Sequence, residues 1–123
     1  TVRSLQSESY YNRTTGTTGR GRMPSREQLE QLLGDDPTDV FLIYAVAMAC
    51  ASEGNVDEAI EKLSELVDGQ PDYVPAWFQR GQLLAGVNRE EEAREVLVEG
   101  IDVARRVGDS HAEGEMIEFL ESL

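Results

Sequence analysis

The sequence predicts an all-α protein, an α–α superhelix in which about six helices pack as consecutive hairpins. Three observations lead to this prediction. The chain repeats itself at a spacing of 34 residues, which is typical of stacked helical units. Helix-capping residues, glycines and prolines recur at the intervals expected between short helices. No run of β-branched residues shows the period of two that a strand requires.

Two repeat units make up the middle of the chain, residues 40–73 and 74–107. At a shift of 34 they share eight identical positions, where this composition gives roughly two or three by chance. The identical pairs are Val40/Val74, Ala51/Ala85, Glu58/Glu92, Ala59/Ala93, Glu61/Glu95, Leu63/Leu97, Glu65/Glu99 and Asp68/Asp102. Each unit is therefore expected to form a helix, a tight turn and a second helix. Small residues at matching places, such as Ala47 and Gly81, let the paired helices approach closely.

Start and stop signals place the individual helices. The first is expected over 25–33, where Ser25 and Gln28 form a capping box and Gly34 ends the helix. The others are expected at 38–52, 55–68, 74–85, 88–106 and 110–122. Three of them are expected to open with caps formed by the pairs Asn55/Glu58, Asn88/Glu91 and Ser110/Glu113. The helices at 25–33 and 110–122 are expected to cap the two units, because a repeat unit cannot bury its apolar face alone.

Charge divides the chain into two parts. Residues 1–23 hold four arginines against one glutamate, a net charge of +3, and residues 24–123 hold 7 basic against 23 acidic residues, a net charge of −16. The first part has too few apolar residues to offset the entropy of ordering it. It is predicted to be a flexible basic tail, or an extension before a natural start at Met23; the alternative is a basic arm that folds back onto the acidic domain. Residues 24–123 are predicted to form one helical domain.

The second unit places large and small residues in a recognisable order. Its members are Trp77, Gly81, Ala93, Leu97 and Gly100. The first unit supplies the corresponding Ile43, Ala47, Ala59, Leu63 and Leu66, with Pro71 closing it. With the 34-residue period, this order resembles the tetratricopeptide repeat (TPR) family.

Two residues depart from the pattern of that family. Arg80 stands where the family usually has an aliphatic residue, and Arg105 stands where it has proline. Without that proline, the last helix of the second unit is expected to run on through Arg106 toward a capping helix.

The helix at 38–52 is the candidate binding element, because its residues are apolar on every face. A helix of this kind is expected to be buried on every face. In the resembling family the first helix of each pair lines a concave groove. The resemblance therefore implies a partner-binding groove for a protein or peptide, formed by Phe41, Tyr44, Met48, Phe78 and Gln82. No cation stands at these groove positions, so the clamp that chaperone-binding members use for a C-terminal carboxylate is absent.

Two alternatives to a partner groove stay open. In the first, the N-terminal helix covers the apolar stripe. In the second, another copy of the chain covers it, and the protein is a structural, self-associating subunit such as a homodimer. A third and more distant reading is an acidic domain that binds basic proteins by charge alone.

Composition excludes several other function classes. A net charge of −13 argues against nucleic-acid binding and against docking to anionic membranes. The longest apolar run, 40–51, is too short to span a bilayer, and a cytoplasmic location is expected. The single cysteine, Cys50, excludes an intramolecular disulfide and is expected to be a core residue, and His111 is expected at the surface. With Glu90, Glu91 and Glu92 interpreted as a solvated helix start, we expect no enzyme, no metal site and no cofactor.

Overall fold

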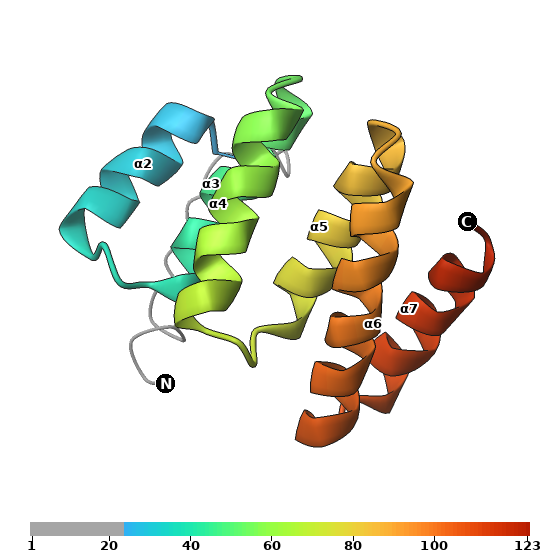
Figure 1. Ribbon diagram of the computed structural model, residues 1–123. Coiled ribbons are helices and arrows are strands. Elements are labelled where there is room, and N and C mark those ends of the chain that lie inside the picture. Colours follow the sequence, from blue (N-terminus) through green and yellow to red (C-terminus); the bar gives the residue numbers. More distant parts are fainter. Residues whose placement is uncertain (1–23) are drawn as a thin grey trace.

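The computed structural model describes residues 24–123, whose regular elements are all helices. They are α2 (Arg26–Asp35), α3 (Val40–Ser52), α4 (Val56–Gly69), α5 (Val74–Gly86), α6 (Glu90–Val107) and α7 (Ser110–Glu121) (Figure 1). The predicted all-α fold is confirmed. The expectations for residues 1–23 concern a segment outside the described range.

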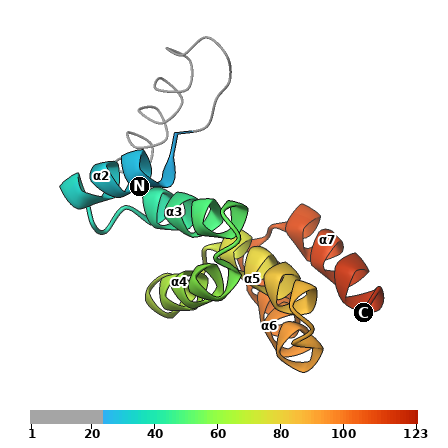
Figure 2. The same cartoon turned by 90° about the horizontal axis from the view of Figure 1, so that it is seen from above.

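Helices that follow one another in the chain also pack against one another. The packed pairs are α2 on α3, α3 on α4, α4 on α5, α5 on α6 and α6 on α7, and α5 also contacts α7. Seen from above, α3, α5 and α7 follow one another along one side of the molecule, and α4 and α6 lie along the other (Figure 2). This two-layered succession of hairpins is the α–α superhelix that the repeat predicted.

Local sequence sets several of the helix starts as predicted. The Ser25 hydroxyl accepts a hydrogen bond from the Gln28 backbone N–H at 3.1 Å, and the Gln28 side chain accepts one from the Ser25 N–H at 2.8 Å. The capping box is therefore confirmed. Gly34, however, does not end the helix, which continues to Asp35 because the glycine lies on an exposed face where nothing interrupts the turn.

The side-chain caps predicted at Asn55 and Asn88 do not form. Asn55 precedes α4 but its side chain makes no capping hydrogen bond. Asn88 lies two residues before α6 with φ 64°, the left-handed conformation that Gly54 adopts with φ 90° one repeat earlier. Gly54 and Asn88 therefore take equivalent positions in the turns between the paired helices of the two units.

Aspartates cap the helices where serine and threonine were expected to begin them. The carboxylate of Asp39, 1% exposed, accepts from the Leu42 N–H at 3.1 Å, so α3 begins at Val40 and not at 38. Likewise Asp109, not Ser110, caps α7 by accepting from the Ala112 N–H at 3.0 Å. An ionised carboxylate is the stronger acceptor at the positive end of a helix.

The core fills the space between the hairpins with large residues set against small ones. Leu63, Leu97 and Trp77 are buried, and the Trp77 indole N–H donates to the Pro71 carbonyl at 2.8 Å. A Cβ added to Gly81 would lie 2.7 Å from Leu97 Cδ2, which confirms that the small residue sets the helix spacing.

Arg80, which departs from the family pattern, is the exception to this packing. It occupies the position equivalent to the buried Val46, and its Nε is buried without a hydrogen-bond partner in the part of the chain that the structure describes. An unsatisfied buried N–H costs about 1–3 kcal/mol.

The last helix closes the open end of the second hairpin. Met116 of α7 is fully buried, and the rings of Phe119 and Phe78 meet edge to face with centroids 6.0 Å apart. α6 runs to Val107, as the missing proline predicted, before Gly108 turns the chain with φ 82°. Among the helices between residues 24 and 123, none has the length and apolar character that a membrane crossing demands.

Candidate functional site

The candidate site forms on α3, whose sequence VFLIYAVAMACAS carries apolar residues on every face. Leu42, Val46 and Cys50 are buried against α2 and α4. The expectation that α3 is buried on every face is wrong, because Phe41, Tyr44 and Met48 stay only half-buried. Two packing neighbours are too few to enclose a helix, so one apolar stripe remains accessible.

This stripe forms one wall of a pocket of about 440 Å³, hereafter the α2–α3 pocket. Its α3 wall consists of Phe41, Tyr44, Ala45, Met48, Ala49, Ser52 and Glu53, and its opposite wall of Pro24, Ser25, Arg26 and Leu29. Of these eleven residues two carry a charged side chain, Arg26 and Glu53, and three carry a hydroxyl, Ser25, Tyr44 and Ser52. The wall from Phe41 to Ser52 carries no charge. A concave, mostly apolar surface with few polar groups is the usual form of a ligand or peptide site.

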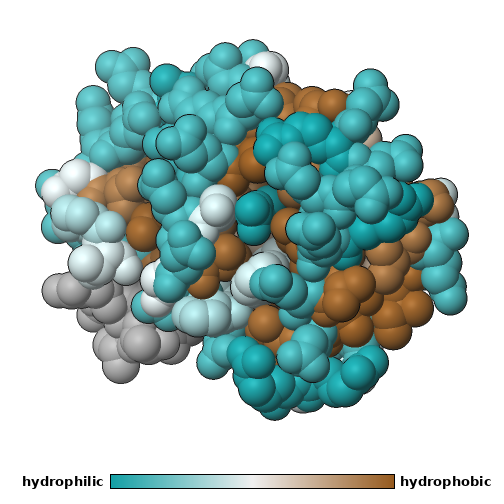
Figure 3. All heavy atoms as spheres, in the orientation of Figure 1, coloured by the Kyte–Doolittle hydropathy of each residue, from teal (hydrophilic) through white to brown (hydrophobic). Residues whose placement is uncertain are grey.

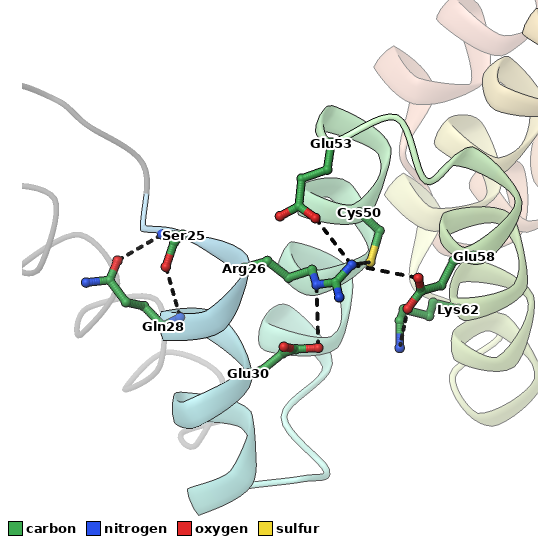
Figure 4. Close-up of polar contacts among 8 residues, drawn as sticks. All are labelled: Ser25, Arg26, Gln28, Glu30, Cys50, Glu53, Glu58 and Lys62. Carbon is green, nitrogen blue, oxygen red and sulfur yellow. Dashed lines mark hydrogen bonds and ion pairs between the residues drawn. The ribbon is translucent and has the colours of Figure 1, made fainter.

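The polar edge of the pocket centres on Arg26. Its guanidinium lies 3.7 Å from a Glu30 carboxylate oxygen, 3.3 Å from one of Glu53 and 3.7 Å from one of Glu58, and it donates to Cys50 Sγ at 3.5 Å (Figure 4). Lys62 also pairs with Glu58 at 3.9 Å, so two cations meet three carboxylates and this edge keeps a net negative charge.

Burial changes the ionisation of two side chains beside the pocket. Burial raises the pKa of Tyr44, whose ring also contacts that of Tyr73 with centroids 5.5 Å apart. Burial, and then the Glu58 charge, raises the pKa of Cys50, while Arg26 opposes them. Both groups therefore stay protonated at neutral pH, and Cys50 is a buried thiol rather than an activated nucleophile.

The structure divides the residues that the sequence proposed for one groove. Phe41, Tyr44 and Met48 come together in the α2–α3 pocket. Phe78 lies instead in a hollow of about 310 Å³ that it shares with Phe119, Glu115, Glu118 and Ser122. Gln82 is half-buried and lines neither hollow. The separation follows from α7, whose Phe119 engages the Phe78 ring.

The sequence named the first helix as one possible cover of the apolar stripe but did not identify the residues that face it. These are Arg26 and Leu29 of α2, with Pro24 just before the helix. The apolar stripe that contains Leu29 was the available signal, but it does not reveal which side of α3 it covers. The pocket cation, Arg26, lies on α2 and outside the repeat helices that carry the predicted groove positions.

A larger hollow, of about 900 Å³, lies between the end of α4 and α6. Figure 3 shows the face carried by these helices, with hydrophilic side chains over most of it and hydrophobic patches among them, the broadest toward the lower right. Charged side chains of both signs line it, among them Asp68, Asp102 and Arg105, and Arg106 bridges to Asp72 at 2.9 Å beside it. This hollow lacks the continuous apolar wall of the α2–α3 pocket.

The residues that carry reactive chemistry are spread over the described helices. His111 lies on α7 with 87% of its side chain exposed, 3.3 Å from Glu115, while Cys50 is buried on α3. In residues 24–123 no three histidine, cysteine, aspartate or glutamate side chains converge as a metal site would require. Glu91 and Glu92 at the start of α6 pair with Arg94 and Arg89 and are exposed.

The chain is similar to several known helical-repeat proteins, although no family model matches it. It is 28% identical over 97 residues to a TPR repeat-containing protein of Pseudomonas aeruginosa, covering 79% of this chain and 92% of that protein. The solution structure of a tetratricopeptide repeat domain protein from Salinibacter ruber is 31% identical, with TM-score 0.68 over 71% of this chain and 88% of that one. A Bordetella parapertussis protein of known solution structure is 26% identical, with TM-score 0.72 over 82% of this chain and 88% of that one.

Proposed function

Because the chain belongs to the tetratricopeptide repeat family, we propose that it is a protein-interaction module that holds an apolar segment of a partner protein in the α2–α3 pocket. The observation that carries this proposal is the accessible stripe of Phe41, Tyr44 and Met48 on a helix that is otherwise packed. Members of this family are generally scaffolds without catalytic activity, and the proposal assigns no reaction to this chain.

The binding chemistry follows from the walls of the pocket. The aromatic rings of Phe41 and Tyr44 and the thioether of Met48 favour an apolar or aromatic side chain as the anchor of the partner. The negative edge around Arg26 favours a cation beside that anchor and disfavours an acidic neighbour. Phe78 and Gln82 stay predicted contacts of a longer partner that continues along α5.

The proposal is tested by selecting peptides from a display library against the full chain and measuring their Kd. The double variant Tyr44→Glu/Met48→Glu places two charges in the pocket and is expected to weaken selected peptides by more than about tenfold, roughly 1.4 kcal/mol. The matched control is Val98→Glu on α6, where the side chain is 57% exposed outside the pocket, and it is expected to leave Kd unchanged.

Two outcomes would contradict the proposal. A double variant that keeps its helical circular dichroism and binds every peptide as the wild type does removes the pocket from function. Binding that disappears at high salt would assign recognition to charge alone, because apolar contacts survive screening.

Self-association is the competing use of the same stripe. Light scattering on the full chain distinguishes it from partner binding. A dimer that Tyr44→Glu/Met48→Glu converts into a folded monomer would make the pocket a homodimer contact instead of a partner site.

A further inference from the structure

The α2–α3 pocket lies at the point where the first 23 residues join the helical domain. Pro24, the first described residue, is itself part of the pocket wall. We propose that residues 1–23 of the same chain are a ligand of this pocket, anchored by Tyr10 and Tyr11, and compete there with a partner. The competition rests on the proposed function of the pocket, whereas the docking itself does not.

Charge complementarity is the first argument for this occupant. The described residues carry a net charge of −16, and at the pocket edge Glu30, Glu53 and Glu58 meet two cations, Arg26 and Lys62, which leaves one negative charge in excess. Residues 1–23 carry a net charge of +3. Their arginines are Arg3, Arg13, Arg20 and Arg22. A basic segment beside an acidic edge is attracted to it, and attraction of this kind biases both the encounter and the register of binding.

Side-chain chemistry is the second argument. Tyr10 and Tyr11 are adjacent, and they are the only aromatic residues before Pro24. Tyrosine combines a large apolar ring with a hydroxyl that can stay in water, which suits a half-open pocket walled by Phe41, Tyr44 and Met48. Val2 and Leu5 are smaller and lie farther from the join, and Met23, which adjoins Pro24, is not aromatic.

The length of the segment is the third argument. The pocket wall on α3 extends from Phe41 to Ser52, a rise of roughly 16 Å at 1.5 Å per residue. Residues 12–23 separate the tyrosine pair from Pro24, and twelve residues can span roughly 40 Å. A tethered ligand of this kind experiences an effective concentration on the order of millimolar. Even an intrinsic Kd of about 1 mM therefore keeps the pocket half occupied.

Paramagnetic relaxation in the full chain tests the docking. A nitroxide is attached to Ser9→Cys in a Cys50→Ala background, so that position 9 carries the single thiol. We expect the amide signals of Tyr44, Ala45 and Met48 to lose more than half of their intensity. Signals of Val98 and Glu99, on the face of α6 outside the pocket, are expected to keep theirs. The spectrum without the label verifies that Cys50→Ala is folded.

Matched variants assign the effect to the tyrosine pair. Tyr10→Ser/Tyr11→Ser is expected to restore the intensities in the pocket, and Thr14→Ser/Thr15→Ser is expected to leave the broadening in place. Unchanged pocket signals in the labelled chain, or equal broadening on both faces, would overturn the proposal. So would broadening in a mixture of labelled and isotope-enriched chains, because the contact would then pass between two molecules.

The same variants separate this inference from the proposed function. If the segment competes, Tyr10→Ser/Tyr11→Ser tightens the binding of a selected peptide by about twofold or more at the effective concentration above. If relaxation shows no docking while Tyr44→Glu/Met48→Glu still abolishes peptide binding, the self-ligand is wrong and the partner pocket stands. If relaxation shows docking but no selected peptide binds, the self-ligand stands and the partner pocket is wrong.

Discussion

Gly81 and Gly100, on the second hairpin, have no side chain and so let the neighbouring helices approach closely. A Cβ on Gly100 would lie 2.8 Å from the Trp77 Cβ and 2.9 Å from the Met116 sulfur. The Trp77 Cβ is fixed to its backbone, so the position has no flexible neighbour on that side that could yield. Gly100 is thus a point where α5, α6 and α7 meet closely.

Gly100→Ala is therefore expected to destabilise the protein by about 1–3 kcal/mol, the usual cost of overpacking a core. The control is Gly114→Ala on α7, where nothing lies within 4 Å of the added Cβ. Because alanine is the better helix former, this control is expected to stabilise by about 0.5–1 kcal/mol. Urea denaturation measures both changes. Equal effects at the two positions would show that helix propensity, and not the close approach, decides.

At the scale of the elements, α7 is a short helix that packs on both α5 and α6. It buries Met116 against α6 and brings Phe119 to Phe78 of α5. Its removal would expose the apolar surface that Met116 covers beside Gly100 and Trp77. A capping role for α7 therefore stays a prediction, which a deletion tests.

Deletion of residues 110–123 is expected to abolish the cooperative unfolding transition, measured by circular dichroism on heating. A finer test uses Met116→Ala, which is expected to lower the free energy of unfolding by about 2–5 kcal/mol. Met116→Leu nearly conserves the side-chain volume and is expected to cost less than about 1.5 kcal/mol. A truncated chain that melts at the wild-type temperature would show that α7 is not a cap.

At the scale of the whole molecule, the thiol of Cys50 and the phenol of Tyr44 make the free energy of unfolding depend on pH in the alkaline range. The pKa of Cys50 is raised above its ordinary value of 9.0, and the pKa of Tyr44 above 10.0. The unfolded chain therefore releases these protons at lower pH than the folded chain does. Since the folded state then binds more protons, the free energy of unfolding falls as pH rises above 9.

Urea denaturation between pH 7 and pH 11 measures this decline, a range of roughly two units on either side of the cysteine value. The variant Cys50→Ala/Tyr44→Phe lacks both groups and is expected to lose less stability over this range than the wild type. Parallel curves for the two proteins would assign the alkaline decline to the other titrating groups.

The sequence predicts the molecule best where the information is repeated or local. The 34-residue period specified two hairpins, and the burial of Trp77 and Leu97 follows from it. The capping box at Ser25 depends on four consecutive residues, and it formed as expected. Where several capping residues stand side by side, as at Asp109 and Ser110, local pattern alone does not decide which one is used.

The candidate site was less predictable because it depends on the packing of elements distant in sequence. Periodicity marked the apolar stripe on α3 but could not show that α2 forms the opposite wall. It likewise could not show that Phe78 would contact Phe119 of α7 and line another hollow. The departure at Arg80 was visible, yet its buried Nε depends on three-dimensional surroundings.

The succession of packed helices also has a kinetic meaning. Apart from the contact between α5 and α7, every extensive packing interface in the described chain joins elements that are neighbours in sequence. Proteins with such local contacts have low contact order and fold in microseconds to milliseconds. Folding then requires only short loop closures. It can begin at any hairpin and spread to the next one. Helix α2 packs extensively on α3 only and reaches α4 through contacts such as the Arg26–Glu58 ion pair, so we expect it to detach and open the pocket without unfolding the hairpins.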